Sequence, residues 1–317
     1  MLFSPTALHI PDGFLSISIA VVFWLISIIM VGIAVIKTNK TLGEKQIPLM
    51  GIMAAFIFAA QMLNFPVAGG TSGHFLGGAL AAIVLGPWEG ILVMTAVVAV
   101  QGFLFQDGGL LVMGANIFNM GILTAVIGFG LYRLVINKSK GLRYTVIGIA
   151  SWLATMTAAL FTSLQLWLSG TTRLEIVVPA MLGVHALIGI GEAIITMAAV
   201  GFIEQTRPDL LAGSEKTSRG SRVWIFAGIT ISLLTILISP LASGDPDGLE
   251  RIAEDIGFLN SSISSPYSIL PDYTLPFLGD TGFSTIIAGL VGILVVIFIL
   301  FLLGRILIKR SNREFSK

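Results

Sequence analysis

The sequence predicts an all-α protein, a polytopic helical bundle in a membrane, and three observations support this fold class. Of the 317 residues, 55% are hydrophobic and only 11% are charged, whereas soluble domains carry about 25% charged residues. The mean hydropathy is +0.96. The apolar residues also form runs of the length, about 20 helical residues, that crosses a hydrocarbon core about 30 Å thick. These properties exclude an ordinary water-soluble enzyme.

Nine apolar segments follow one another along the chain. We expect membrane spans near residues 14–36, 47–64, 74–87, 89–106, 110–136, 144–168, 178–203, 223–241 and 284–308. The third is short, and a short span flanked by glycines often borders a binding site. The first seven spans form one predicted domain, residues 1–203. A polar cytoplasmic linker over 204–222 then leads to a two-span hairpin in a second domain, 223–317.

The positions of Lys and Arg predict the orientation in the cell membrane. With the N-terminus outside and nine crossings, all of the 18 cationic residues except Arg173 and Arg251 lie on the cytoplasmic side. The first cation is Lys37, so no positively charged region of a signal peptide precedes the first span. We therefore expect a multi-pass cell-membrane protein with a cytoplasmic C-terminus.

Composition also limits the chemistry. The chain has no cysteine, which excludes disulfides, thiolate metal sites and iron–sulfur clusters. The net charge of +1 gives no indication of a nucleic-acid partner. No Walker A sequence occurs, so the chain is not expected to hydrolyse ATP itself.

Two of the three histidines fall on the predicted outer face. His9 precedes the first span, and His74 follows the glycine-rich turn 69–73. Glycines let the backbone approach a ligand closely. Two neutral imidazoles without a thiolate suit Ni²⁺, Co²⁺, Cu²⁺ or Zn²⁺. The alternative is that both are interfacial histidines with ordinary hydrogen-bond partners.

Several separated motifs resemble one known family. HIPDGFLS at 9–16, NFPVAGGTSGHFLGGALAAIVLGPWEG at 64–90 and GVHALIGIGEAIIT at 183–196 are similar to the CbiM/NikM proteins. Those are the substrate-binding membrane components of cobalt and nickel energy-coupling-factor (ECF) transporters. Residues 245–250, DPDGLE, resemble the PDGLE segment of the small accessory subunit of the same transporters, here fused in frame.

The resemblance implies a nearly planar site of four nitrogens. In the family these are the terminal amine, the amide nitrogen and imidazole of residue two, and a second histidine after the glycine-rich turn; the two imidazoles correspond to His9 and His74. Because eight residues precede His9, the amine is available only if the mature chain begins at Leu8, and we hypothesise that it does. A planar nitrogen set favours Ni²⁺ or Cu²⁺ over Co²⁺. Since the ligands must be deprotonated, uptake is expected to weaken as the pH falls.

Other polar residues in the apolar segments are candidates for supporting roles. His185 and Glu192 lie seven residues apart on one helical face, where helix packing or a coupling contact is the simpler expectation than metal ligation. Five further side chains could orient the imidazoles or form hydrogen bonds between helices: Asn64, Gln101, Asp107, Asn116 and Asn119.

By this resemblance the chain is the substrate-capture subunit of an ATP-driven ECF importer, with no catalytic residues and no organic cofactor. A transmembrane coupling protein and ABC-type ATPase subunits are expected as separate chains. Ni²⁺ is the first choice and Co²⁺ the second, because the fusion is more typical of the nickel transporters. The outer loop before the last span carries seven carboxylates, which could attract divalent ions or could simply be solvated.

Two alternative functions remain open. Residues Gly70-Thr71-Ser72-Gly73 satisfy the short motif of an intramembrane serine protease, for which His185 would be the base. An ion-driven metal transporter or channel is the other, although the inverted repeats typical of such folds are not detectable in the sequence.

Overall fold

The computed structural model describes residues 9–41, 43, 46–211 and 223–314, and nearly all of its regular structure is helical. The helices are α1 (Ile17–Thr41), α2 (Gln46–Gln61), α3 (Gly78–Leu85), α4 (Pro87–Val100), α5 (Met113–Asn116), α6 (Thr124–Arg133), α7 (Lys140–Leu168), α8 (Leu174–Thr206), α9 (Val223–Ile238), α10 (Gly248–Ile256) and α11 (Gly282–Glu314). π-helical turns at Gln101–Phe105 and Ile117–Leu123 extend α4 and join α5 to α6. Short 3-10 turns occur at Pro208–Leu210, Ser239–Leu241, Leu259–Ser261 and Pro271–Tyr273. The strands β1 (Phe65–Pro66) and β2 (Ser72–Gly73) pair antiparallel.

This architecture confirms the predicted fold class. Seven helical segments in the described part of the chain are long and apolar enough to cross a membrane, and α2 is a shorter apolar helix of 16 residues. The chain is therefore a multi-pass helical membrane protein.

The predicted third span, 74–87, is wrong in form. Only Gly78–Leu85 is helical, and it lies between two glycines with positive φ, Gly77 at 83° and Gly86 at 102°. Such backbone favours glycine, which has no Cβ to clash. Because α3 is buried almost throughout, its irregular ends face protein and not lipid, where unpaired backbone would be costly.

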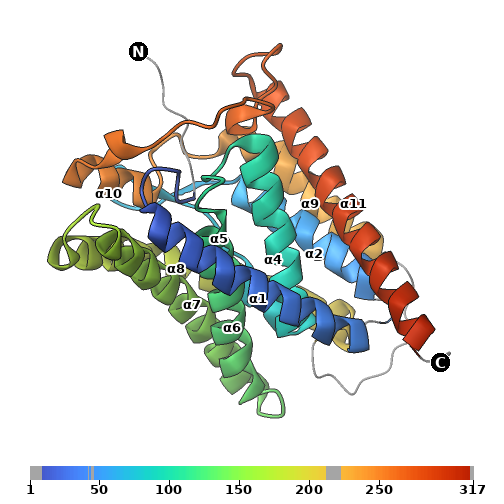
Figure 1. Ribbon diagram of the computed structural model, residues 1–317. Coiled ribbons are helices and arrows are strands. Elements are labelled where there is room, and N and C mark those ends of the chain that lie inside the picture. Colours follow the sequence, from blue (N-terminus) through green and yellow to red (C-terminus); the bar gives the residue numbers. More distant parts are fainter. Residues whose placement is uncertain (1–8, 42, 44–45, 212–222, 315–317) are drawn as a thin grey trace.

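The helices are arranged around a central pair, α3 and α4. The hairpin of α7 and α8 lies on one side, and α9 and α11 lie on the other, both packed against α2 (Figure 1). Close packing of α11 depends on small residues, since a Cβ on Gly292 would lie 2.0 Å from the ring of Phe58. The C-terminal hairpin is therefore packed into the bundle and is not merely tethered to it.

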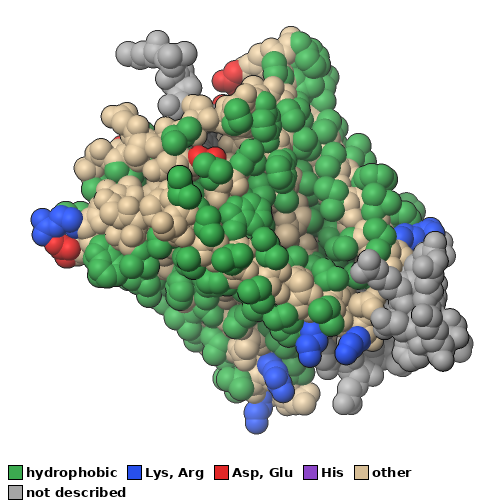
Figure 2. All heavy atoms as spheres, in the orientation of Figure 1, with side chains coloured by type: hydrophobic (Ala, Val, Ile, Leu, Met, Phe, Trp, Pro, Cys, Tyr) green, Lys and Arg blue, Asp and Glu red, His purple; other side chains and the backbone are tan. Residues whose placement is uncertain are grey.

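The loops that carry the candidate site meet at one end of the bundle. The segment before α1 lies there beside α10, which comes from the long loop between α9 and α11 (Figure 1). Figure 2 shows Lys and Arg side chains gathered mainly at the opposite end, with one further group at the loop between α7 and α8. The bundle thus has a cationic end and, away from it, the end that holds His9 and His74.

Candidate metal centre

The fold brings His9 and His74 together although they are 65 positions apart in sequence. Both are buried, and their ring centroids lie 5.5 Å apart with the rings nearly perpendicular, at 81°. Two imidazoles that bind one metal ion at bond lengths of about 2.0–2.1 Å place their centroids roughly 4.5–6.5 Å apart. The pair therefore has a separation that one shared ion can bridge.

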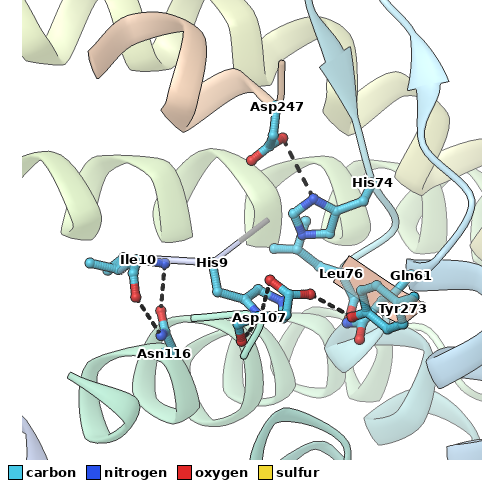
Figure 3. Close-up of polar contacts among 9 residues, drawn as sticks. All are labelled: His9, Ile10, Gln61, His74, Leu76, Asp107, Asn116, Asp247 and Tyr273. Atoms are coloured by element: carbon cyan, nitrogen blue, oxygen red, sulfur yellow. Dashed lines mark hydrogen bonds and ion pairs between the residues drawn. The ribbon is translucent and has the colours of Figure 1, made fainter. Parts of the chain in front are cut away.

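Each imidazole faces a carboxylate through Nδ1. His9 Nδ1 lies 3.2 Å from the carbonyl oxygen of Asp107 and 3.3 Å from its Oδ1, and His74 Nδ1 lies 3.5 Å from Asp247 Oδ1 (Figure 3). Nε2 of His9 is buried without a hydrogen-bond partner. Histidines that bind metals usually have their second ring nitrogen against a carboxylate or carbonyl, which fixes the ring. This arrangement leaves Nε2 of His9 available to a ligand.

The two histidines differ in their electrostatic surroundings. Burial lowers the pKa of His9, and the nearby Asp107 offsets this effect only in part. Burial acts in the same direction on His74, but the Asp247 carboxylate outweighs it and raises the pKa of His74. Since neutral imidazole is the form that binds a metal, His9 is in the binding form over a wider pH range.

The segment that carries His9 is held by hydrogen bonds to its backbone. Asn116 accepts from the Ile10 amide at 3.1 Å and donates to the Ile10 carbonyl at 3.0 Å (Figure 3). The Asp12 carboxylate accepts from three consecutive amides, those of residues 110–112, at 2.9–3.2 Å. A Cβ on Gly108 would lie 2.8 Å from the Cβ of His9, so the glycine permits this close approach. Asn116 thus positions the backbone next to His9 and makes no bond to the imidazole.

A carboxylate in α8 holds the segment that carries His74. Glu192 is buried and accepts from the amides of Leu76 and Gly77, at 2.7 and 3.0 Å. The Gln61 side-chain amide donates to the Leu76 carbonyl at 2.7 Å. The backbone just after His74 is therefore held by side chains of two helices, Gln61 of α2 and Glu192 of α8.

The other predicted residues are placed differently. Asn119 forms hydrogen bonds with Thr162 and Gln165 on α7. Of the two roles expected from the sequence, it therefore has the hydrogen bond between helices and not the orientation of an imidazole. Asn64 accepts from the Ser243 amide through its backbone carbonyl, and its side-chain oxygen is buried without a partner. Neither of these asparagines contacts an imidazole in the hydrogen bonds found.

His185 shares a cavity with the pair. A cavity of about 60 Å³ is lined by residues that include His9, His74, His185 and Asp247. His185 Nδ1 lies 2.8 Å from the Met181 carbonyl of its own helix. In the described part of the chain, no three His, Cys, Asp or Glu side chains are grouped closely enough to hold an ion by themselves. A complete coordination sphere therefore calls for other donors, such as backbone nitrogens or water.

The predicted backbone donor, the amine of Leu8, lies outside the described residues. A chelate ring that joins the amide nitrogen of His9 to its own imidazole closes through Nδ1, the nitrogen that here faces Asp107. Such a chelate would therefore compete with the contact between His9 Nδ1 and Asp107.

The protease alternative lacks its catalytic pair. The Ser72 hydroxyl donates to the Asp245 carbonyl at 2.8 Å, and His185 is engaged with Met181. Since these contacts point the two side chains to different partners, Ser72 is not activated by His185 in this arrangement.

A second cavity, of about 80 Å³, lies next to the first. Leu249 lines both cavities, and Glu250, Asp12 and Ser262–Ser265 contribute to the wall of the second. Burial, together with the neighbouring Glu254 and Asp247, raises the pKa of Glu250 to about 7. Asp247 and Glu250 of the DPDGLE motif therefore face two different cavities.

We expect Glu250→Gln to change how stability depends on pH. An acid whose pKa is raised by folding stabilises the protein most when it is protonated. The contribution of Glu250 to the free energy of unfolding is therefore full below about pH 4.5 and is lost as the pH rises to about 7. Because the Glu250 side chain is partly exposed, we expect its contribution to change by about 1 kcal/mol between low and high pH, or roughly 2–4 °C in the midpoint of thermal unfolding. Melts at pH 5 and pH 8 should show a smaller decline for Glu250→Gln than for the wild type and for Asp255→Asn, which removes an exposed carboxylate of the same helix. Equal declines in all three would contradict the burial argument.

Comparisons with known proteins cover both halves of the chain. Residues 9–210 match the family described as the cobalt uptake substrate-specific transmembrane region, and residues 221–309 match the PDGLE domain. A putative fused nickel transport protein NikMN of Archaeoglobus fulgidus is 39% identical over 300 residues, which cover 94% of this chain and 98% of the relative. A fused nickel transport protein NikMN of Rhodobacter capsulatus is 26% identical over 330 residues, covering 92% and 95%.

Two further similar proteins match part of the chain. A cobalt transport protein CbiM of Acetohalobium arabaticum is 29% identical over 181 residues, covering 56% of this chain and 68% of the relative. A crystal structure of a truncated transition metal transporter superposes with a TM-score of 0.56 at 34% identity, covering 62% of this chain and 98% of that one.

Proposed function

The chain belongs to the cobalt uptake substrate-specific transmembrane family of nickel and cobalt transport proteins, and from this premise we propose that it is the substrate-capture subunit of an ATP-driven ECF-type importer. The observation that carries the proposal is the buried pair His9 and His74, with a carboxylate behind each ring and an unpartnered Nε2 on His9. The ion is the transported substrate. The chain supplies ligands and performs no covalent chemistry.

In this proposal His9 and His74 bind Ni²⁺ at the outer face, with Co²⁺ as the second choice. The amine of Leu8 would be a further ligand if the mature chain begins there. Of the other predicted residues, Asn116 and Glu192 position the two binding segments and His185 lines the cavity. Asn119 joins helices through Thr162 and Gln165, and Asn64 holds the loop at Ser243 through its backbone carbonyl. The N-terminus lies outside and the C-terminus in the cytoplasm, as the cationic end of the bundle favours.

The proposal assigns the remaining functions to other parts and other chains. Residues 1–203 form the metal-binding domain, 204–222 the linker and 223–317 the accessory domain. ATP hydrolysis is assigned to ABC-type ATPase subunits, coupled through a separate transmembrane protein. If the isolated chain imported Ni²⁺ fully without them, an ion-driven transporter would be the better description.

Native mass spectrometry of the purified full chain, supplied with Ni²⁺ and separately with Co²⁺, tests the proposal. A chain that starts at residue 8 with one ion bound supports both the capture function and the terminal chelate. A chain that starts at Met1 with one ion bound supports capture by the two imidazoles and overturns the chelate. No bound ion under either start would contradict the proposed function.

A further inference from the structure

The loop of the accessory domain is joined to the metal-binding domain beside His74. The Ser72 amide donates to the Pro246 carbonyl at 2.9 Å, and the Ser72 hydroxyl donates to the Asp245 carbonyl at 2.8 Å. Ser72 and Asp247 form a parallel β-bridge. Residues 245–247 therefore run alongside β2, and β2 ends at Gly73, the residue just before His74.

This contact places an accessory-domain carboxylate against a candidate ligand. Asp247 is 3% exposed, and its Oδ1 lies 3.5 Å from His74 Nδ1 (Figure 3). The next residues begin α10, which packs against α8, and Leu249 covers the cavity that contains both histidines. Asp247 is thus held in place by backbone pairing on one side and by helix packing on the other.

The same loop reaches the other histidine through Asp107. The hydroxyl of Tyr273, a buried residue of the loop, donates to Asp107 Oδ2 (Figure 3). The second oxygen of that carboxylate, Oδ1, lies 3.3 Å from His9 Nδ1. The Tyr273 ring stacks on Phe105, with centroids 4.7 Å apart, which fixes the direction of the hydroxyl.

We propose that the accessory domain is a structural part of the metal centre, in which Asp247 and Tyr273 are positioning residues for His74 and His9. Asp247 acts on His74 directly, and Tyr273 acts on His9 by fixing the Asp107 carboxylate. A carboxylate at one ring nitrogen orients the imidazole and makes its other nitrogen a better donor. This inference rests on the proposed function, since it concerns the residues assigned there to the ion.

The test measures Ni²⁺ affinity of the full chain in Asp247→Asn and Tyr273→Phe. Loss of such a supporting group typically costs 10–100-fold in metal affinity, so we expect about that loss for Asp247→Asn. Tyr273→Phe should give a smaller loss, because it acts through Asp107. The matched controls are Asp245→Asn, which removes an exposed carboxylate two residues away, and Tyr267→Phe, which removes a hydroxyl of the same loop.

A second readout separates positioning from general destabilisation. The visible absorption spectrum of bound Co²⁺ at saturation reports ligand geometry, and it should shift in Asp247→Asn but not in Asp245→Asn. If Asp247→Asn proves too unstable to purify, Tyr273→Phe alone carries the test, since it removes one hydroxyl and leaves the stacked ring.

The outcomes separate this inference from the proposed function. If His74→Ala abolishes binding while Asp247→Asn and Tyr273→Phe match their controls in affinity and spectrum, the inference is overturned and the proposed function stands. If His74→Ala binds Ni²⁺ as tightly as the wild type, the proposed function itself fails.

Discussion

Replacing His74 with alanine is expected to lower the affinity for Ni²⁺ by at least about a hundredfold, because removal of a ligand should exceed the 10–100-fold loss that follows removal of a group behind a ligand. His9→Ala should have a comparable effect, since the two rings share one cavity with centroids 5.5 Å apart. Isothermal titration of the purified chain with Ni²⁺ measures both variants.

His185→Ala is the informative comparison for these two variants. His185 lines the same cavity, but its Nδ1 faces a carbonyl of its own helix and it has no carboxylate behind its ring among the contacts found. We therefore expect a clearly smaller loss of affinity than for His74→Ala. A loss as large as that of His74→Ala would contradict a site built on two histidines and would make His185 a ligand.

The fold and the pair of histidines were accessible from sequence because their signals are local. Long apolar runs predict membrane helices whatever their neighbours. The glycine-rich turn before His74 indicates irregular backbone that must lie against protein. The form of the third segment was not accessible, since helix 78–85 ends where buried glycines adopt positive φ in response to tertiary packing.

Asp247 shows why the outer loop was harder to interpret. Its sequence neighbours include several acidic residues, and seven carboxylates in one loop are typical of solvated chain. Its actual position depends on a β-bridge with Ser72 and a contact with His74, both more than 170 residues away in sequence. One local signal was available: Leu249, Ile252, Ala253 and Ile256 repeat at helical spacing, and the first three are buried in α10. An apolar helical face in an otherwise polar loop predicts that the loop docks on the protein.

The polar residues within the helices illustrate a different limit. A buried amide or carboxylate in a membrane helix has to find a partner, but sequence does not say which. The side chains of Asn119 and Gln165 form hydrogen bonds with each other between two helical segments. Asn116 and Glu192 instead form hydrogen bonds with the backbone beside the two histidines. Since the hydrogen bonds of Asn116 and Glu192 go to backbone and not to an imidazole, we expect any effect of these residues on metal binding to be exerted through the backbone.

Glu192 is therefore expected to give the largest loss of stability among the residues around the site. In Glu192→Ala the amides of Leu76 and Gly77 lose their common acceptor inside the protein. An unsatisfied buried donor costs about 1–3 kcal/mol, so the two together should cost about 3 kcal/mol, or roughly 6–12 °C in the midpoint of thermal unfolding. Glu192→Gln keeps one acceptor oxygen but turns an NH₂ group toward the other amide, and should lie between alanine and the wild type.

Glu175→Ala is the matched control, because it removes a carboxylate from the same helix at an exposed position paired with Arg173. Exposed ion pairs contribute about 0–1 kcal/mol, so its midpoint should stay within a few degrees of the wild type. Ni²⁺ affinity measured below the melting range should fall in Glu192→Ala and not in Glu175→Ala, since only Glu192 fixes the backbone that presents His74. Glu192→Ala could instead have the same midpoint of thermal unfolding as Glu175→Ala and the Ni²⁺ affinity of the wild type. The backbone after His74 would then have to be held by Gln61 alone, and the positioning role of Glu192 would be wrong.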